Sequence, residues 1–403
     1  MIPRAQTPRR AAAVLRLAGS LLACACTLSG CTSSVQYYAQ AVAGQSSLLA
    51  SSRPVDEWLS DPATTPQLRE RLELAMRIRS FASTRLGLPD NHSYKRYADL
   101  HRSSALWNVF AAPRLSLTLK TWCYPLVGCA GYRGYFDQKQ AEAMAQQLEG
   151  EGWDTYVGPV PAYSTLGWLP DPLLNTFINW PEPELARLIF HELAHQVIYV
   201  RDDTRFNESF ATAVERAGLA RWVAERKDPE LQRRYEAYRL RQADLLALLQ
   251  QTRERLQDLY QQEPAGGAGA AAAQGAQTEA QRLARKQQIL AQLPLRYEQV
   301  RDERWDGFHG FDAYFRAPWN NARIAAMAAY NDDVPAFEAL LAREQGDLPR
   351  FFAAVKQLAA LAPAQREAQI KALAAGPGAG QPEAAAPAAQ FPAQAPAPAG
   401  TAR

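Results

Sequence analysis

The chain has 403 residues, of which 47% are apolar and 21% charged, so it can fold around a substantial core. Its formal net charge of +3 includes Arg4, Arg9, Arg10 and Arg16, which lie in a segment that we expect to be removed; +3 less four leaves −1. This balance provides no basic field, so no nucleic-acid partner is expected.

Residues 1–30 are predicted to be a lipoprotein signal peptide. Arginines precede a short apolar run at residues 17–28, which is too short to span a bilayer, and Leu28-Ser29-Gly30-Cys31 resembles a bacterial lipobox. Cys24 is a poorer candidate because almost no apolar run precedes it. Lipidation of Cys31 would anchor the chain in a membrane, and Thr32 after it favours the outer membrane, facing the periplasm. The alternative is an ordinary secretory signal.

Two cysteines remain beyond the signal, Cys123 and Cys129. In an oxidising compartment we expect a disulfide that closes this small loop. Two buried free thiols are the alternative, and a zinc pair is disfavoured because no matching second pair exists.

The N-terminal half predicts a mixture of helices and strands. Apolar spacing and breakers indicate helices at 67–86 and 138–149 and strands at 108–119, 132–136 and 155–160. A proline-rich connection follows at 161–183. Tyr163 to Gly167 within it could supply an edge strand for substrate backbone or serve as a plain connector.

The segment 185–200 predicts a helix that is apolar almost all round and therefore buried. Its exceptions form a stripe at i, i+4 spacing: Arg187, His191, His195 and Tyr199. A buried helix cannot leave such a stripe unsatisfied, so the stripe must face an ion, a cleft or a partner network. A second helix at 206–225 follows a short turn, so it must run back antiparallel and bring Glu208 and Glu215 toward the histidines.

The rest of the domain, predicted to span 31–361, contains a helical hairpin insertion at about 226–297 with a low-complexity tip at 264–277. Two further helices are expected between 305 and 361. Residues 362–403 are predicted to be a disordered Ala/Pro-rich tail.

His191, Glu192 and His195 form an H-E-x-x-H unit, which is typical of zinc peptidases because positions i and i+4 share a helix face about 6 Å apart. Two imidazoles and a carboxylate suit Zn²⁺. In the expected mechanism Glu192 is the general base that takes a proton from the zinc-bound water and later hands it to the leaving amine. Glu208 and Glu215 lie about 10.5 Å apart along a helix at 1.5 Å per residue, so only one can be the third ligand.

Asn207-Glu208-Ser209-Phe210-Ala211, followed by Glu215, resembles the N-E-x-x-A segment of gluzincin aminopeptidases. That resemblance implies Glu208 as the ligand and Glu215 as its support. Gluzincins have a longer spacer between the second histidine and the ligand, and their spacing would fit Glu215 instead, so both remain candidates.

More of the chain resembles a bacterial family of predicted periplasmic zinc aminopeptidases, usually lipoproteins. The matching segments are 131–136, 162–167, the zinc stretch and Asn320-Asn321-Ala322-Arg323. An aminopeptidase also needs an oxyanion donor, for which His309, Tyr314, Tyr330 and Arg323 are candidates, and a carboxylate for the substrate amine, for which Asp171, Glu184 and Glu215 are candidates.

Together these features predict an α+β, mainly helical, zincin-like metallopeptidase domain. The expected function is zinc-dependent hydrolysis of peptides in the bacterial periplasm, from the N-terminus. The alternatives are a zinc endopeptidase and a non-catalytic, zinc-containing envelope assembly or binding protein.

Overall fold

The computed structural model describes residues 37–124, 128–261, 278–328 and 332–375. The chain divides into two compact units, residues 1–50 and 51–403. In the first unit, residues 37–50 are helical. Within the described ranges, no helix combines the length and the apolar character needed to cross a bilayer.

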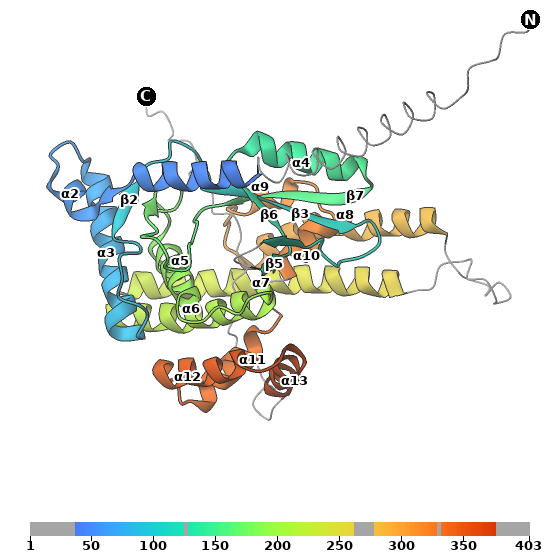
Figure 1. Cartoon of the computed structure of the whole chain (residues 1–403). Coiled ribbons are helices and arrows are strands. Elements are labelled where there is room, and N and C mark those ends of the chain that lie inside the picture. The colour runs from blue at the N-terminus through green and yellow to red at the C-terminus, as the bar shows by residue number, and fades with distance from the viewer. Residues whose placement is uncertain (1–36, 125–127, 262–277, 329–331, 376–403) are drawn as a thin grey trace, which may run out of the picture. The chain divides into compact units, whose positions relative to one another are not determined.

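The second unit is a mixed α+β structure that is mainly helical (Figure 1). Its strands are β1 (Arg53–Pro54), β2 (Arg96–Ala98), β3 (Leu106–Pro113), β4 (Trp122–Tyr124), β5 (Gly128–Ala130), β6 (Arg133–Tyr135), β7 (Trp153–Val160) and β8 (Leu173–Leu174). Its helices are α2 (Val55–Ser60), α3 (Pro66–Leu86), α4 (Gln138–Gly150), α5 (Glu182–His195), α6 (Thr204–Arg226), α7 (Pro229–Gln261), α8 (Glu279–Arg304), α9 (Asp312–Arg316), α10 (Asn321–Ala328), α11 (Val334–Arg343), α12 (Leu348–Ala359) and α13 (Pro363–Ala374).

The sheet that borders the site has the order β6-β3-β7 and is antiparallel throughout. Helix α4 packs on one face and α10 on the other (Figure 1). The central residue Asn108 pairs with Gly134 on one side and with Gly158 on the other. Because side chains alternate along a strand, Asn108 and Phe110 share the face that α10 covers. A second small sheet joins β1, β2 and β8, and β4 and β5 form a hairpin closed by the Cys123–Cys129 disulfide.

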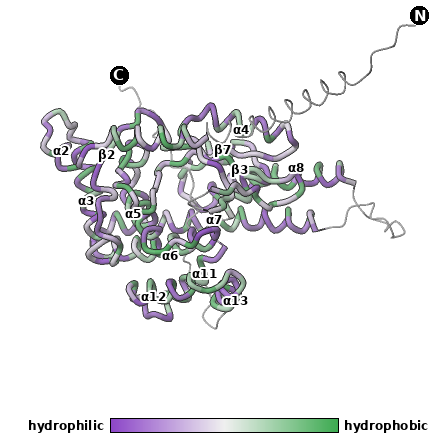
Figure 2. The backbone as a smooth tube through the Cα atoms, in the orientation of Figure 1, coloured by the Kyte–Doolittle hydropathy of each residue, from purple (hydrophilic) through white to green (hydrophobic). Residues whose placement is uncertain are grey.

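The main helical core contains α3, α5 and α6. Figure 2 shows hydrophobic residues concentrated along α5, in contrast to the more hydrophilic α8. Helix α5 is buried on almost every side because Leu185, Ile189, Phe190 and Leu193 all lie in the interior. Gly218 lets α6 approach its neighbours closely: a Cβ there would lie 2.7 Å from Leu86 Cδ1 and 2.9 Å from Phe190 Cδ2.

We therefore expect Gly218→Ala to destabilise the protein by about 1–3 kcal/mol, because the added methyl group overpacks this helix contact. Gly150→Ala is the matched control, since a Cβ at Gly150 meets nothing within 4 Å. That control should be neutral or stabilise α4 by about 0.5–1 kcal/mol. Urea unfolding of both variants measures the difference, and equal effects would contradict a close contact at Gly218.

Several predicted elements have different bounds. The strand predicted at 108–119 is β3, which ends at Pro113, so Leu115 to Leu119 are not in a strand. The central helix ends at His195 rather than at residue 200. Beyond it, the Gln196 side chain accepts from Asn91 Nδ2 at 2.7 Å and donates to Ser93 Oγ at 3.2 Å, which holds the chain in a turn.

Part of the predicted C-terminal tail is a helix, and residues 376–403 lie outside the described residues. Residues 363–374 form α13, although the sequence predicted disorder from residue 362. Ile370 and Leu373 are buried, and Arg366 binds Asp203 through Nε at 2.9 Å. This contact ties the helix to the start of α6, so a few buried side chains outweigh the Ala-rich composition.

Helices α7 and α8 pack against each other as the predicted hairpin. The hairpin begins at residue 229 and ends at residue 304, whereas the sequence predicted residues 226 and 297. Its apolar seam continues into Trp305, Phe315 and Trp319, so the hairpin shares a core with the segment that follows it. The predicted low-complexity tip, 264–277, lies outside the described residues.

Candidate metal centre

The two helices that carry the candidate ligands are α5 and α6, which pack against each other. The turn between them is fixed from both ends. Asp203 caps α6 by accepting from Phe206 N at 3.1 Å, and the Asn207 side chain both donates to Val200 O and accepts from Val200 N, each at 2.7 Å. Asn207 thus holds the connection in place directly beside Glu208.

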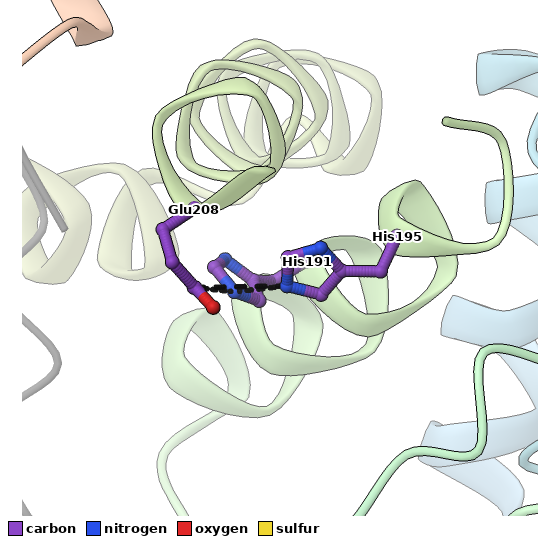
Figure 3. A group of neighbouring side chains, drawn as sticks. All are labelled: His191, His195 and Glu208. Atoms are coloured by element: carbon purple, nitrogen blue, oxygen red, sulfur yellow. Dashed lines mark hydrogen bonds and ion pairs between the residues drawn. The ribbon is translucent and has the colours of Figure 1, made fainter. Parts of the chain in front are cut away.

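Three side chains meet between these helices (Figure 3). The Nε2 atoms of His191 and His195 are 3.1 Å apart. Glu208 Oε2 lies 3.2 Å from His191 Nε2 and 3.6 Å from His195 Nε2. The two imidazoles are buried, and the Glu208 side chain is 14% exposed. One face of the cluster is therefore closer to solvent than the other.

The donor set fits a zinc ion. A tetrahedral ion with bonds of about 2.0–2.1 Å separates its ligand atoms by about 3.3–3.4 Å, and the three observed edges bracket this value. Two nitrogens and one carboxylate oxygen from the protein leave a fourth position, which is the composition of a catalytic zinc site. Figure 3 shows all three side chains directed toward a common point.

Electrostatics in the cluster favour a positive charge. Burial alone would lower the pKa of His191, but its contacts with Glu208 and Glu215 raise that pKa to about 10. Burial likewise opposes ionisation of Glu208, yet the two histidines hold its pKa at about 2. These shifts show that the carboxylates attract a cation, which is a proton or a metal ion.

Glu215 lies on the other side of His191. Its Oε2 is 2.9 Å from His191 Nδ1 and 3.4 Å from Arg187 Nη1, and its side chain is 1% exposed. A bond from Nδ1–H to this carboxylate would leave Nε2 unprotonated and directed toward Glu208 and His195. The structure thus separates the two glutamates that the sequence left in competition: Glu208 lies with the ligand atoms and Glu215 supports one imidazole.

Glu192 lies near the cluster, because the charges of His191, His195 and Glu208 all act on its carboxyl group. It lines a cavity together with Arg187 and Leu188 of α5 and residues of β3 and β7. Burial raises the pKa of Glu192, the two histidines lower it, and Glu208 and Glu215 raise it again. A carboxylate with a raised pKa beside a candidate metal is suited to exchange protons.

Three of the four predicted oxyanion donors, Arg323, Tyr314 and His309, bind other groups between residues 312 and 327. Arg323 donates to the backbone carbonyls of Tyr314, Ala317 and Pro318 at 2.6–3.0 Å. Tyr314 donates to Met327 Sδ at 3.0 Å. His309 is exposed and lies 3.2 Å from Asp312. These contacts engage all three in the packing of the 305–327 segment, whereas Tyr330, like the proposed lipidation site Cys31, falls outside the described residues.

The carboxylates suggested for the substrate amine are also engaged. Asp171 accepts from Thr165 N and Thr165 Oγ1, which holds the 164–171 loop, and Glu215 binds His191 and Arg187. Burial raises the pKa of Glu184, while Arg187 and Arg241 lower it. Tyr163 to Gly167 is a loop with turns and no strand, so the edge-strand interpretation is wrong.

Sequence reasoning missed Tyr132. Burial raises its pKa, and the charges of Glu208 and Glu192 raise it further, so its hydroxyl stays protonated beside the cluster. The Tyr124 hydroxyl donates to Tyr132 O at 3.2 Å, so the disulfide-closed hairpin helps to position it. The only signal was that Tyr132 belongs to one of the segments that resemble the bacterial aminopeptidases.

Fold and cluster together define an α+β protein with a candidate metal site of H-E-x-x-H type, completed by a carboxylate from the next helix. A family model described as "Putative aminopeptidase" matches residues 36–370, and the chain belongs to this family. No curated protein and no solved structure matches the chain. The zincin-like fold therefore stays a prediction.

Proposed function

We propose that this protein is a zinc-dependent aminopeptidase that removes residues from the N-terminus of peptides. The observation that supports it best is the cluster of His191, His195 and Glu208, with Glu192 beside it, in a chain of the aminopeptidase family. The predicted signal peptide and lipidation at Cys31 would place it at the bacterial outer membrane, facing the periplasm, with peptides as substrates.

In this proposal His191, His195 and Glu208 hold Zn²⁺, and Glu215 orients His191 by accepting from its Nδ1. Bound zinc would polarise the scissile carbonyl and lower the pKa of a water. Glu192 accepts the proton of the attacking water, and the same proton passes to the nitrogen of the leaving amine as the C–N bond breaks. One water is consumed, and Glu192 ends in its starting protonation state.

The Tyr132 hydroxyl is our candidate donor to the developing oxyanion. Burial and the neighbouring carboxylates raise its pKa, so the hydroxyl keeps the proton that it would donate. A donor fixed before the reaction stabilises charge that develops in the transition state. Tyr132→Phe removes this donor and leaves the ring against Phe110, which it contacts at 5.7 Å between centroids.

The aminopeptidase proposal predicts that the purified full-length chain shortens free peptides stepwise and leaves N-acetylated versions of the same peptides intact. A chelator should abolish the activity, and added Zn²⁺ should restore it, because the ligands hold the ion that the reaction needs. Mass spectrometry of the products identifies the bond that is cut. Cleavage of acetylated peptides at internal bonds would establish an endopeptidase, and zinc-loaded protein that cleaves no peptide would establish a non-catalytic zinc protein.

A further inference from the structure

A cavity of about 90 Å³ lies next to Glu192. Its walls come from the sheet residues Phe110, Tyr156 and Gly158 on one side and from Leu188 and Glu192 of α5 on the other. Because Glu192 would act at the scissile bond, a side chain next to that bond lies within reach of this cavity.

The cavity exists because the sheet carries little side-chain bulk around Asn108. Cross-strand neighbours on one face normally fill the space above a strand, yet both partners of Asn108 are glycines. A Cβ at Gly158 would stand 3.0 Å from Tyr156 Cε1 and 3.5 Å from Phe110 Cε2. Any side chain at Gly158 therefore occupies the space between these rings, and the glycine keeps it open.

The walls are mainly apolar and are held in fixed positions. Phe110 and Tyr156 stack with ring centroids 5.9 Å apart. The Arg323 guanidinium lies 5.4 Å from the Tyr156 ring centre, and the Tyr314 hydroxyl bonds to Met327, another lining residue. Two residues predicted as oxyanion donors thus support this cavity.

The polar groups of the cavity disfavour a charged occupant. The charge of Arg187 is matched by Glu215, which its Nη1 contacts at 3.4 Å. In the proposed function, Glu192 is the group that carries the proton. Asn108 is 7% exposed, and its Oδ1 has no hydrogen-bond partner among the described residues. A neutral amide can accept from a hydroxyl but cannot neutralise a charge, so a lysine or glutamate side chain would lose its hydration without compensation.

We infer that this cavity is the specificity pocket of the enzyme and takes a large, uncharged apolar or aromatic side chain of a residue that flanks the scissile bond. The inference rests on the proposed function. It predicts faster cleavage of peptides with leucine, methionine, phenylalanine or tyrosine at that position than of peptides with glycine, alanine, lysine or glutamate.

The test uses Gly158→Val, which adds a side chain against the Tyr156 and Phe110 wall and narrows the cavity, and Met327→Ala, which enlarges it. Peptide sets that vary the first or the second residue are compared by kcat/KM. At one of these positions Gly158→Val should lower the leucine-to-alanine ratio at least about 10-fold, as expected for lost apolar contacts in a pocket. Met327→Ala should shift the preference toward larger aromatic residues. Gly150→Ala, which lies in open space, serves as the control and should change neither ratio.

Binding measurements keep the inference separate from the proposed function. If the wild-type protein cleaves no peptide, the proposed activity fails. Calorimetry still tests the pocket, with leucine amide against glycine amide for the first position and glycyl-leucine amide against glycylglycine amide for the second. In one of these pairs the wild type should bind the leucine ligand more tightly, and Gly158→Val should remove that difference. Thermal unfolding identifies a variant that has not folded. Unchanged preferences in both folded variants, by rate or by binding, overturn the inference.

Discussion

Glu192→Gln should lower kcat by about 10²–10⁴-fold while one zinc ion per chain stays bound. The amide has nearly the same shape as the carboxylate but cannot accept a proton from the attacking water. Glu192 lines the cavity and is not among the three clustered ligand atoms, so its loss should leave the metal in place. Steady-state kinetics and metal analysis of the same preparation give both quantities.

Glu182→Gln is the matched control for this substitution. Glu182 lies in the first turn of the same helix, where it accepts from Trp222 Nε1 at 2.9 Å and pairs with Arg226 at 3.3 Å. We expect the variant to lose about 1 kcal/mol of stability, because the Arg226 side chain is 37% exposed and the glutamine oxygen can still accept from Trp222, and to retain full activity. If Glu192→Gln were as active as this control, Glu192 would not be the base and another group would have to move the proton.

The chemistry of the site could be predicted from the sequence where it depends on spacing within one helix. His191 and His195 are four residues apart, and any α-helix places residues at this spacing on one face. The antiparallel return of the next helix followed from the short turn, so the approach of Glu208 and Glu215 was also predictable. Which of them meets the Nε2 atoms depends on how α6 is rotated about its axis, and that rotation is set by contacts such as Gly218 against Phe190.

Features built from distant segments could not be predicted in the same way. The pocket joins β3, β7, α5 and α10, and its lining includes Gly158, which pairs with Asn108 across the sheet. The pairing of residues between distant strands leaves no pattern within any one segment of the sequence. Arg323 and Tyr314 were predicted as candidate oxyanion donors. Without their neighbours, the sequence could not show that they contact residues that line this pocket.

Glu208 and Glu215 contact different nitrogens of His191, so substitution of each should affect zinc binding differently. Glu208→Gln is expected to leave the protein without stoichiometric zinc, because it removes the charged oxygen that lies 3.2 and 3.6 Å from the two Nε2 atoms. Glu215→Gln should keep the metal but bind it about 10–100-fold more weakly, the usual effect of losing the carboxylate behind a histidine ligand. Competition with a chromophoric chelator measures both affinities.

The two variants should rank in the opposite order by free energy of unfolding, with Glu215→Gln the less stable. Glu215 is buried against Arg187, so Glu215→Gln removes the charge that faces this buried guanidinium. The change should destabilise the metal-free protein by about 3 kcal/mol, with the nearby Glu184 limiting the loss. Glu208 is nearer to solvent, and its loss should cost less. Urea unfolding in the presence of chelator compares the two. If Glu215→Gln instead abolished zinc binding while Glu208→Gln retained it, the ligand would be Glu215, as the longer gluzincin spacing suggested, and α6 would have to be rotated relative to α5.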